Sequence, residues 1–138
     1  INPMDQQQLV KNKRNDLVHP ELSYKIIGCA FEAFNELEYG YAEKEYQKAL
    51  SVLFKKNGLG FKEQVYYPIK FENEVLRKGF CDFIVEEEII VELKKNPRFS
   101  KTHIERVNQY LKSSKLKLAL LINFTPTGVI SKRLLNLY

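Results

Sequence analysis

Apolar residues recur at helical spacing in three stretches of the chain, residues 20–37, 42–56 and 101–114. In each stretch the apolar positions follow an i, i+3, i+4, i+7 pattern, which places them on one face of a helix. Pro20 suits the first turn of the first helix. Gly40 is expected to end that helix, because glycine readily adopts the left-handed backbone of a helix C-terminus.

Strand-forming residues fill the remaining stretches. Residues 63–71, 75–85 and 89–94 are rich in β-branched and aromatic residues and are separated by short polar turns, which predicts three consecutive antiparallel strands. Residues 116–124 are almost wholly apolar, and the helix before them predicts a buried strand parallel to a neighbour. Residues 129–138 fit either a strand or a short helix. The order predicts an α/β (α+β) fold in which helices flank a mixed sheet.

Three charged residues interrupt the apolar strands. Glu92 and Lys94 share one face of a strand because side chains alternate. If the three glutamates before Ile89 form a turn, Val85 pairs with Ile89 and Asp82 lies opposite Glu92, with Cβ atoms about 5 Å apart. Two carboxylates this close repel each other unless a cation lies between them. The alternative is a cross-strand ion pair on a solvated sheet face.

Glu43 is a further candidate acid, at the start of the second helix. It precedes Tyr46 by three residues and Leu50 by seven, so its carboxylate is expected on the inward side of the helix. Spacing alone favours a simpler explanation, in which an acid in the first turn stabilises the helix dipole.

The composition is that of a single globular domain, with 138 residues, 44% of them hydrophobic and 28% charged. Residues 1–16 are polar and predict a flexible N-terminal tail, which leaves residues 17–138 as the domain. The net charge of +5 permits an anionic partner. Cys29 and Cys81 lie in apolar stretches and are expected to be buried, reduced thiols, which favours a cytoplasmic protein. We expect no membrane association, since the chain has neither a long apolar run nor a secretory signal.

The motifs exclude several classes of chemistry. The chain has no Walker loop and no Gly-x-Ser-x-Gly elbow, and the isolated His19 and His103 predict surface or capping residues rather than a zinc site. A hard divalent ion fits better, because magnesium binds through one or two carboxylates together with waters and substrate phosphates. Asp82 and Glu92 offer those carboxylates, and Lys94 can hold a water or stabilise charge on phosphorus. Phosphodiester hydrolysis is therefore a candidate activity.

These residues resemble those of a known group. Asp82 followed by Glu92-Leu93-Lys94, in an αβββαβ order, is similar to the PD-(D/E)XK nuclease superfamily and its restriction-endonuclease-like fold. Residues 40–46 resemble the Gly-x-x-Glu-x-x-Tyr (GxxExxY) signature of a small bacterial and archaeal family placed within it. The resemblance covers about residues 22–136 and includes residues 109–112 and 120–124.

The resemblance implies roles for individual residues. Asp82 and Glu92 would bind magnesium or manganese, with the Leu93 carbonyl as a further ligand, and Lys94 would position the attacking water. Glu43 would be the helix acid beside the metal, in place of a dipole role. Three more residues would support the site: Gly40, Tyr46 and Tyr110.

One position departs from the pattern. Many relatives carry glutamine four residues before the tyrosine of the last helix, where this chain has Arg106 before Tyr110. The cation would contact a phosphate or alter the activity.

The implied substrate is nucleic acid, with DNA favoured. Four cations are candidate phosphate contacts, with solvated surface charge as the alternative: Arg98, Lys101, Arg106 and Lys112. A homodimer is compatible with action on both strands of a duplex. The competing hypothesis is an inactive nucleic-acid-binding or protein-interaction module on the same fold.

Overall fold

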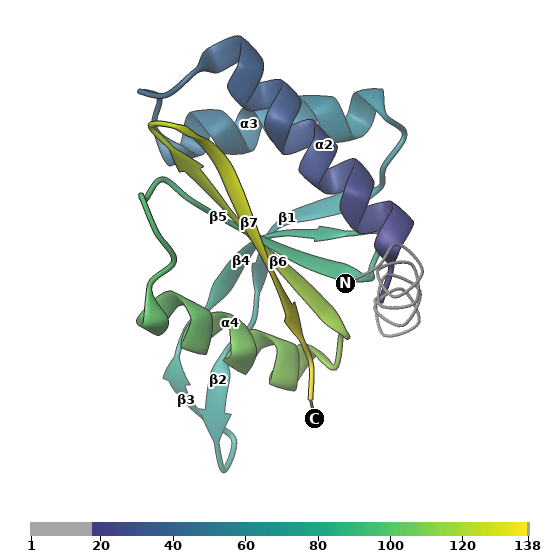
Figure 1. The fold of residues 1–138 in the computed structure, drawn as a ribbon. Helices are drawn as coiled ribbons and strands as arrows, with labels where there is room; N and C mark the ends of the chain where they lie inside the picture. The colour runs from purple at the N-terminus through teal and green to yellow at the C-terminus, as the bar shows by residue number, and fades with distance from the viewer. Residues whose placement is uncertain (1–17, 138) are drawn as a thin grey trace, which may run out of the picture.

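The computed structural model describes residues 18–137. The predicted flexible tail over residues 1–16 lies outside this range. Ten helices and strands follow one another in the described part, and we name them by the labels in Figure 1.

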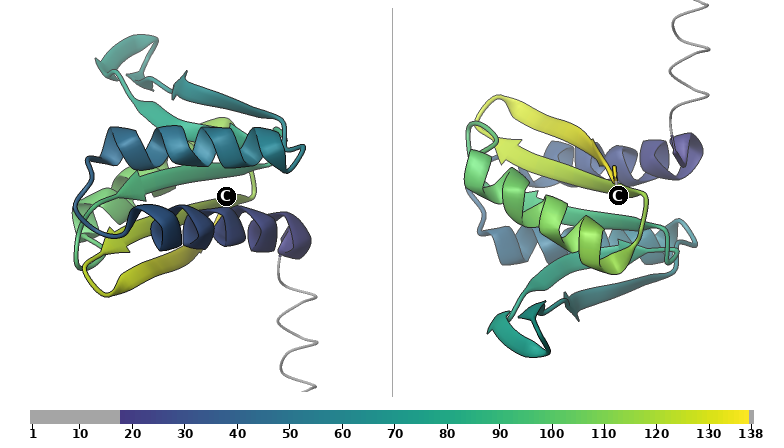
Figure 2. Two further views of the ribbon diagram at one scale, coloured as in Figure 1. Left: turned by 90° about the horizontal axis from the view of Figure 1, so that it is seen from above. Right: turned by 90° about the horizontal axis from the view of Figure 1, so that it is seen from below.

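Helices cover both faces of a central sheet. Helices α2 (Pro20–Leu37) and α3 (Glu43–Lys56) lie on one face, and α4 (Lys101–Ser114) lies on the other (Figures 1 and 2). One buried cluster joins α2 and α3 to the sheet, and a second joins α4 to it. Apolar burial on both faces explains why the central strands are almost continuously hydrophobic.

The sheet has five strands in the order β1-β4-β5-β6-β7. Their bounds are Phe61–Tyr66, Phe80–Val85, Ile89–Lys94, Leu118–Thr125 and Gly128–Leu135. Strands β5 and β6 are parallel, and the other neighbours are antiparallel. This confirms the predicted mixed sheet and the parallel placement of the strand after α4, and it shows that the segment after residue 128 is a strand.

The strands before β5 differ from the prediction. The stretches 63–71 and 75–85, each predicted as one strand, are each divided into two strands. The inner two of these four strands, β2 (Ile69–Phe71) and β3 (Glu74–Arg77), pair with each other in a separate hairpin outside the main sheet. Pro68 separates β1 from β2, as expected of a residue without a backbone N–H. Gly79 separates β3 from β4, where an added Cβ would lie 2.5 Å from the Tyr67 carbonyl oxygen.

The first helix is not ended by the predicted residue. Helix α2 extends to Leu37 and helix α3 to Lys56, as predicted. In α2, however, Glu38, with φ 63°, is the residue that leaves the helical conformation. Gly40 lies two residues later with φ +127°, a backbone conformation that side chains disfavour. Gly40 therefore shapes the connection to α3 rather than terminating α2.

Two further predictions concern the core and membranes. Cys29 and Cys81 are both buried and free, as expected. Burial raises the pKa of the Cys81 thiol to about 12, so it is an inert core residue. No helix in residues 18–137 is long and apolar enough to cross a bilayer.

Candidate active site

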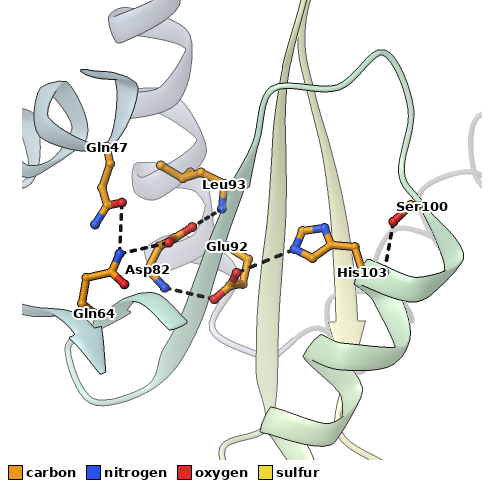
Figure 3. A network of polar contacts seen from close by, with 7 residues as sticks. All are labelled: Gln47, Gln64, Asp82, Glu92, Leu93, Ser100 and His103. Atoms are coloured by element: carbon orange, nitrogen blue, oxygen red, sulfur yellow. Dashed lines mark hydrogen bonds and ion pairs between the residues drawn. The ribbon is translucent and has the colours of Figure 1, made fainter. Parts of the chain in front are cut away.

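Strands β4 and β5 form the centre of the site, and their register is as predicted. Val85 pairs with Ile89, and the antiparallel ladder continues to Phe83 and Val91. Beyond the Phe83–Val91 pair, hydrogen bonds between backbone N–H groups and side-chain carboxylates take the place of backbone–backbone bonds. The Asp82 N–H donates to Glu92 Oε1 at 3.0 Å, and the Leu93 N–H donates to Asp82 Oδ2 at 2.8 Å (Figure 3). The two carboxylates thus satisfy backbone donors where the strands separate.

An irregularity in β1 accompanies this separation. Gln64 has φ 48°, a left-handed conformation that is rare for a residue inside a strand. At this point strand β4 also changes the side of the sheet to which its alternate side chains point. Phe83 packs in the cluster under α2 and α3, whereas Cys81, two residues away, packs in the cluster under α4. Residues two apart share a face in a regular strand, so the pleat is broken at Asp82.

The two acids connect to the helices on opposite faces of the sheet, Asp82 to α3 through Gln64 and Glu92 to α4. Gln64 Nε2 donates to Asp82 Oδ1 and to Gln47 Oε1 of α3, both at 3.2 Å. Glu92 Oε2 lies 3.7 Å from His103 Nε2 of α4. Figure 3 shows this continuous row of side chains, from α3 across β1, β4 and β5 to α4. The site therefore depends on both helical layers and on the sheet between them.

Both carboxyl groups resist ionisation. Burial, followed by repulsion from Glu92, raises the pKa of Asp82 to about 6. Burial raises the pKa of Glu92 to about 7, and the nearby Glu43 raises it further, while the Asp82 N–H, Lys94 and Arg106 oppose the increase. Two acids held in a desolvated pair are a site at which a bound cation is favourable.

His103 is a residue of this site, contrary to the prediction of a surface or capping histidine. Its side chain is 8% exposed, and its Nε2 has no hydrogen-bond partner within residues 18–137. Burial and the nearby Lys94 lower its pKa, which favours a neutral imidazole beside Glu92. Ser100 fills the capping role instead, since its Oγ accepts from the His103 N–H at 3.0 Å.

Glu43 and Lys94 act on the acid pair through space. Glu43 is exposed at the first position of α3, and its charge opposes ionisation of Asp82 and Glu92. The cap of α3 is made by Glu45, whose Oε1 accepts from the Ala42 N–H at 2.9 Å. Half-buried Lys94 favours the ionised form of Glu92. Both residues are thus close enough to influence the pair electrostatically.

The connection between α2 and α3 is fixed near the ends of the central strands. Tyr46 is fully buried, its hydroxyl donates to the Glu38 carbonyl oxygen, and its ring stacks on Phe124 of β6 with centroids 4.2 Å apart. Lys95, directly after β5, lies over the Tyr39 ring at 4.9 Å. These contacts hold the start of α3, and with it Glu43, near the end of β5 that carries Glu92.

The other predicted residues lie mainly on or near α4. Tyr110 is buried, and the centroid of its ring lies 6.2 Å from that of Tyr67. The Tyr110 ring packs so closely on Gly79 that an added Cβ there would lie 2.6 Å from its Cε1. Arg106 is exposed, yet its charge acts on Glu92, His103 and Tyr110. Three more cations are exposed: Arg98, Lys101, which pairs with Glu105 at 3.9 Å, and Lys112.

Three residues of the site region were missed by the sequence interpretation. His103 precedes Val107 by four residues and Tyr110 by seven, a spacing that would have placed it on the buried face of α4. Asn123, next to Lys94 in the β5–β6 register, is fully buried with its Oδ1 unpartnered within the described residues. The sequence interpretation placed Asn123 in an apolar strand and in the 120–124 segment of the resemblance, but gave it no role of its own. Gln64 gives no sequence signal, because its role depends on its backbone conformation.

Comparison with known proteins identifies the family. The sequence profile of the PD-(D/E)XK nuclease superfamily matches residues 20–134. The chain belongs to this superfamily. The match confirms that part of the resemblance. No curated protein sequence matches this PD-(D/E)XK chain.

The fold is similar to that of a solved structure, SSO0001. The crystal structure of SSO0001 shares 17% identity with a TM-score of 0.51, and the match covers 78% of this chain and 61% of SSO0001. An alkaline exonuclease from Laribacter hongkongensis shares 10% identity with a TM-score of 0.41, over 78% of this chain and 76% of the exonuclease. The chain therefore spans less than two thirds of SSO0001.

The side chains present fit a hard divalent cation. Asp82 and Glu92 supply a desolvated pair of carboxylates, and magnesium uses one or two carboxylates with waters and phosphates. Within residues 18–137, no group of three or more His, Cys, Asp or Glu side chains is placed to hold a metal ion. Glu43 therefore influences the pair electrostatically but does not lie where it would be a third protein ligand.

Proposed function

We propose that this PD-(D/E)XK chain is a nuclease that uses Mg²⁺ or Mn²⁺ to hydrolyse phosphodiester bonds, with DNA as the favoured substrate. The observation that carries the proposal is the raised pKa of two adjacent carboxyl groups, half-buried Asp82 and buried Glu92, at the point where their strands separate. A structural ion pair would not keep two acids together in a desolvated position. The GxxExxY assignment rests on residues 40–46 and is part of the proposal.

Each residue then has a chemical task. Asp82 and Glu92 would hold the cation, with the Leu93 carbonyl as a further oxygen. The cation, when bound, supplies a water of lowered pKa and charge to stabilise the phosphate. Lys94 would orient the water and balance developing negative charge, and Glu43 would add negative charge on the α3 side. Arg106 would contact a phosphate next to the scissile one.

The first test is metal-dependent cleavage. We expect the protein to cut labelled single-stranded or duplex DNA with Mg²⁺ or Mn²⁺, and to lose this activity in EDTA, because two carboxylates alone cannot activate water. A parallel RNA substrate of the same sequence tests the preference for DNA. Product mapping on circular and linear substrates distinguishes internal from terminal cutting. Cleavage in EDTA at the same rate would contradict the proposal.

His103 gives a second prediction. Its neutral ring beside Glu92 is expected to position that carboxylate, and loss of a group that orients a metal ligand typically costs 10–100-fold in metal affinity. We therefore expect His103→Ala to weaken Mn²⁺ binding, measured by calorimetry, by about tenfold or more. The polar variant His103→Gln should recover part of the loss.

The matched control for this experiment is Thr102→Ala, an exposed change in the same turn of α4. It should bind Mn²⁺ as the wild type does. If His103→Ala and wild type bind the ion equally well, His103 is only a packing residue.

The alternative is an inactive module that binds nucleic acid or another protein. Two observations favour it: the described residues hold no preformed three-ligand cluster, and Arg106 replaces a glutamine of many relatives. Absence of calorimetric Mn²⁺ binding even with DNA present, together with stable DNA binding, would support this alternative. A homodimer acting on both strands remains a separate proposal that sedimentation in the presence of duplex DNA tests.

A further inference from the structure

A polar groove lies between α3 and β1, next to the strand edge that leads to Asp82. Its volume is ≈ 660 Å³, and its lining includes Lys44, Lys48 and Lys55 from α3 and Glu63 and Gln64 from β1. All three lysines are exposed, and none forms a salt bridge within residues 18–137. Three cations and one anion leave the groove electropositive.

The lysines are spaced along one face of α3. Because a helix rises 1.5 Å per residue, Lys44 and Lys55 are about 16 Å apart along the axis. At 3.4 Å of rise per nucleotide in one strand of a duplex, this length corresponds to about five nucleotides. Lys44 and Lys48 are like charges at i and i+4, which destabilises the isolated helix slightly. Helix stability therefore does not explain their placement.

A second observation connects the groove to the acid pair. Gln47 and Gln64, which also line the groove, bond to each other, and Gln64 bonds to Asp82 Oδ1. Figure 3 shows both amides on the Asp82 side of the row. Gln64 holds a left-handed conformation, and such outliers in strands concentrate at functional sites.

We propose that the groove binds the sugar-phosphate backbone of a nucleic acid strand and leads it to Asp82 and Glu92. The proposal rests on the proposed nuclease function and adds a substrate path on the α3 side of the sheet. Arg106 lies on the α4 side, so a strand that leaves the groove passes the acid pair before it reaches this cation. The lysines contact phosphates and carry no base readout.

The test compares two triple variants with the same change in charge. Lys44→Gln, Lys48→Gln and Lys55→Gln are combined in the groove variant. The control combines Lys25→Gln, Lys70→Gln and Lys132→Gln, which are exposed on α2, β2 and β7. Both sets are made in the Glu92→Ala background to prevent cleavage. Binding of fluorescent single-stranded DNA, duplex DNA and RNA is measured by anisotropy in Mg²⁺ over a salt series.

The expected result is local to the groove. The groove variant should bind its preferred nucleic acid at least tenfold more weakly. The slope of log K against log salt should become about two units less steep, as expected for three lost contacts to a single strand. The control should stay within about twofold of its parent, since distant charges are screened at physiological salt. An unchanged slope, equal losses in both variants, or no binding to any of the three nucleic acids would overturn the proposal.

Cleavage by the groove variant with Glu92 intact separates this proposal from the nuclease proposal. The groove variant should show a raised KM with a nearly unchanged kcat, because the acids are intact. If Glu92→Ala abolishes cleavage but the groove variant binds and cuts normally, the groove proposal is wrong and the nuclease proposal stands. If the groove variant loses binding and no form of the protein cuts, the groove proposal stands and the nuclease proposal is wrong.

Discussion

Glu92→Ala is expected to abolish metal-dependent cleavage, with a loss of about a thousandfold or more. The variant removes a carboxylate that would hold the cation and also the acceptor of the Asp82 N–H. Because that N–H is near the edge of the regular ladder, the fold should survive the change. Cleavage of a labelled oligonucleotide measures the loss, and circular dichroism checks the fold.

The control is Glu36→Ala, which removes an exposed carboxylate from α2 and should leave cleavage unchanged. Lys94→Ala adds a comparison between two roles. It should also stop cleavage, but it should retain Mn²⁺ binding in calorimetry, because Lys94 is proposed to position water and not to hold the ion. Wild-type cleavage by Glu92→Ala would eliminate the proposed mechanism.

Much of the fold could be predicted because it follows from local patterns. The helix bounds 20–37 and 101–114 depend on apolar periodicity, and the Val85–Ile89 pairing depends on the length of one turn. The placement of β6 beside β5 follows from the helical crossover between them. The detached hairpin was not predictable in the same way, because it depends on the close approach of Gly79 to Tyr67 and Tyr110.

In the candidate site, too, the residues that follow from local patterns were predictable, and those that depend on contacts between elements were not. Asp82 and Glu92 were recognisable as charges in otherwise apolar strands, and their adjacency followed from the register. Gln64 was not recognisable, because only a left-handed residue inside β1 brings its amide to Asp82. His103 was misinterpreted because a lone histidine near a helix start is usually a surface residue, whereas α4 packs it against Glu92. Contacts between elements, not composition, decide such roles.

The second large effect concerns stability, and it follows from the raised pKa of Glu92. The unfolded carboxyl has its ordinary pKa near 4.5, and the folded one titrates at about 7. The folded state therefore binds the proton more tightly, so this contribution to stability is complete below about pH 4.5 and is lost as the pH rises toward 7. At pH 8 the metal-free protein contains an ionised, desolvated Glu92 beside Asp82.

Glu92→Gln removes this ionisation and keeps an oxygen that can accept from the Asp82 N–H. In EDTA we expect it to stabilise the fold at pH 8 by about 3 kcal/mol, because each pKa unit between 4.5 and about 7 is worth about 1.4 kcal/mol. At pH 4.5 the gain should nearly vanish. Urea unfolding of wild type and variant at both pH values measures the difference, and Glu36→Gln serves as the exposed control.

Metal addition should reverse the order of stability at pH 8. A divalent ion favours ionised carboxylates, so Mn²⁺ should stabilise the wild type by RT ln(1 + [L]/Kd) and should stabilise Glu92→Gln much less. The destabilising charge of the metal-free site would then be what makes metal binding favourable. If Glu92→Gln is no more stable than wild type at pH 8 in EDTA, Glu92 is not held in a desolvated, charge-repelling position. If Mn²⁺ stabilises both proteins equally, the ion binds elsewhere.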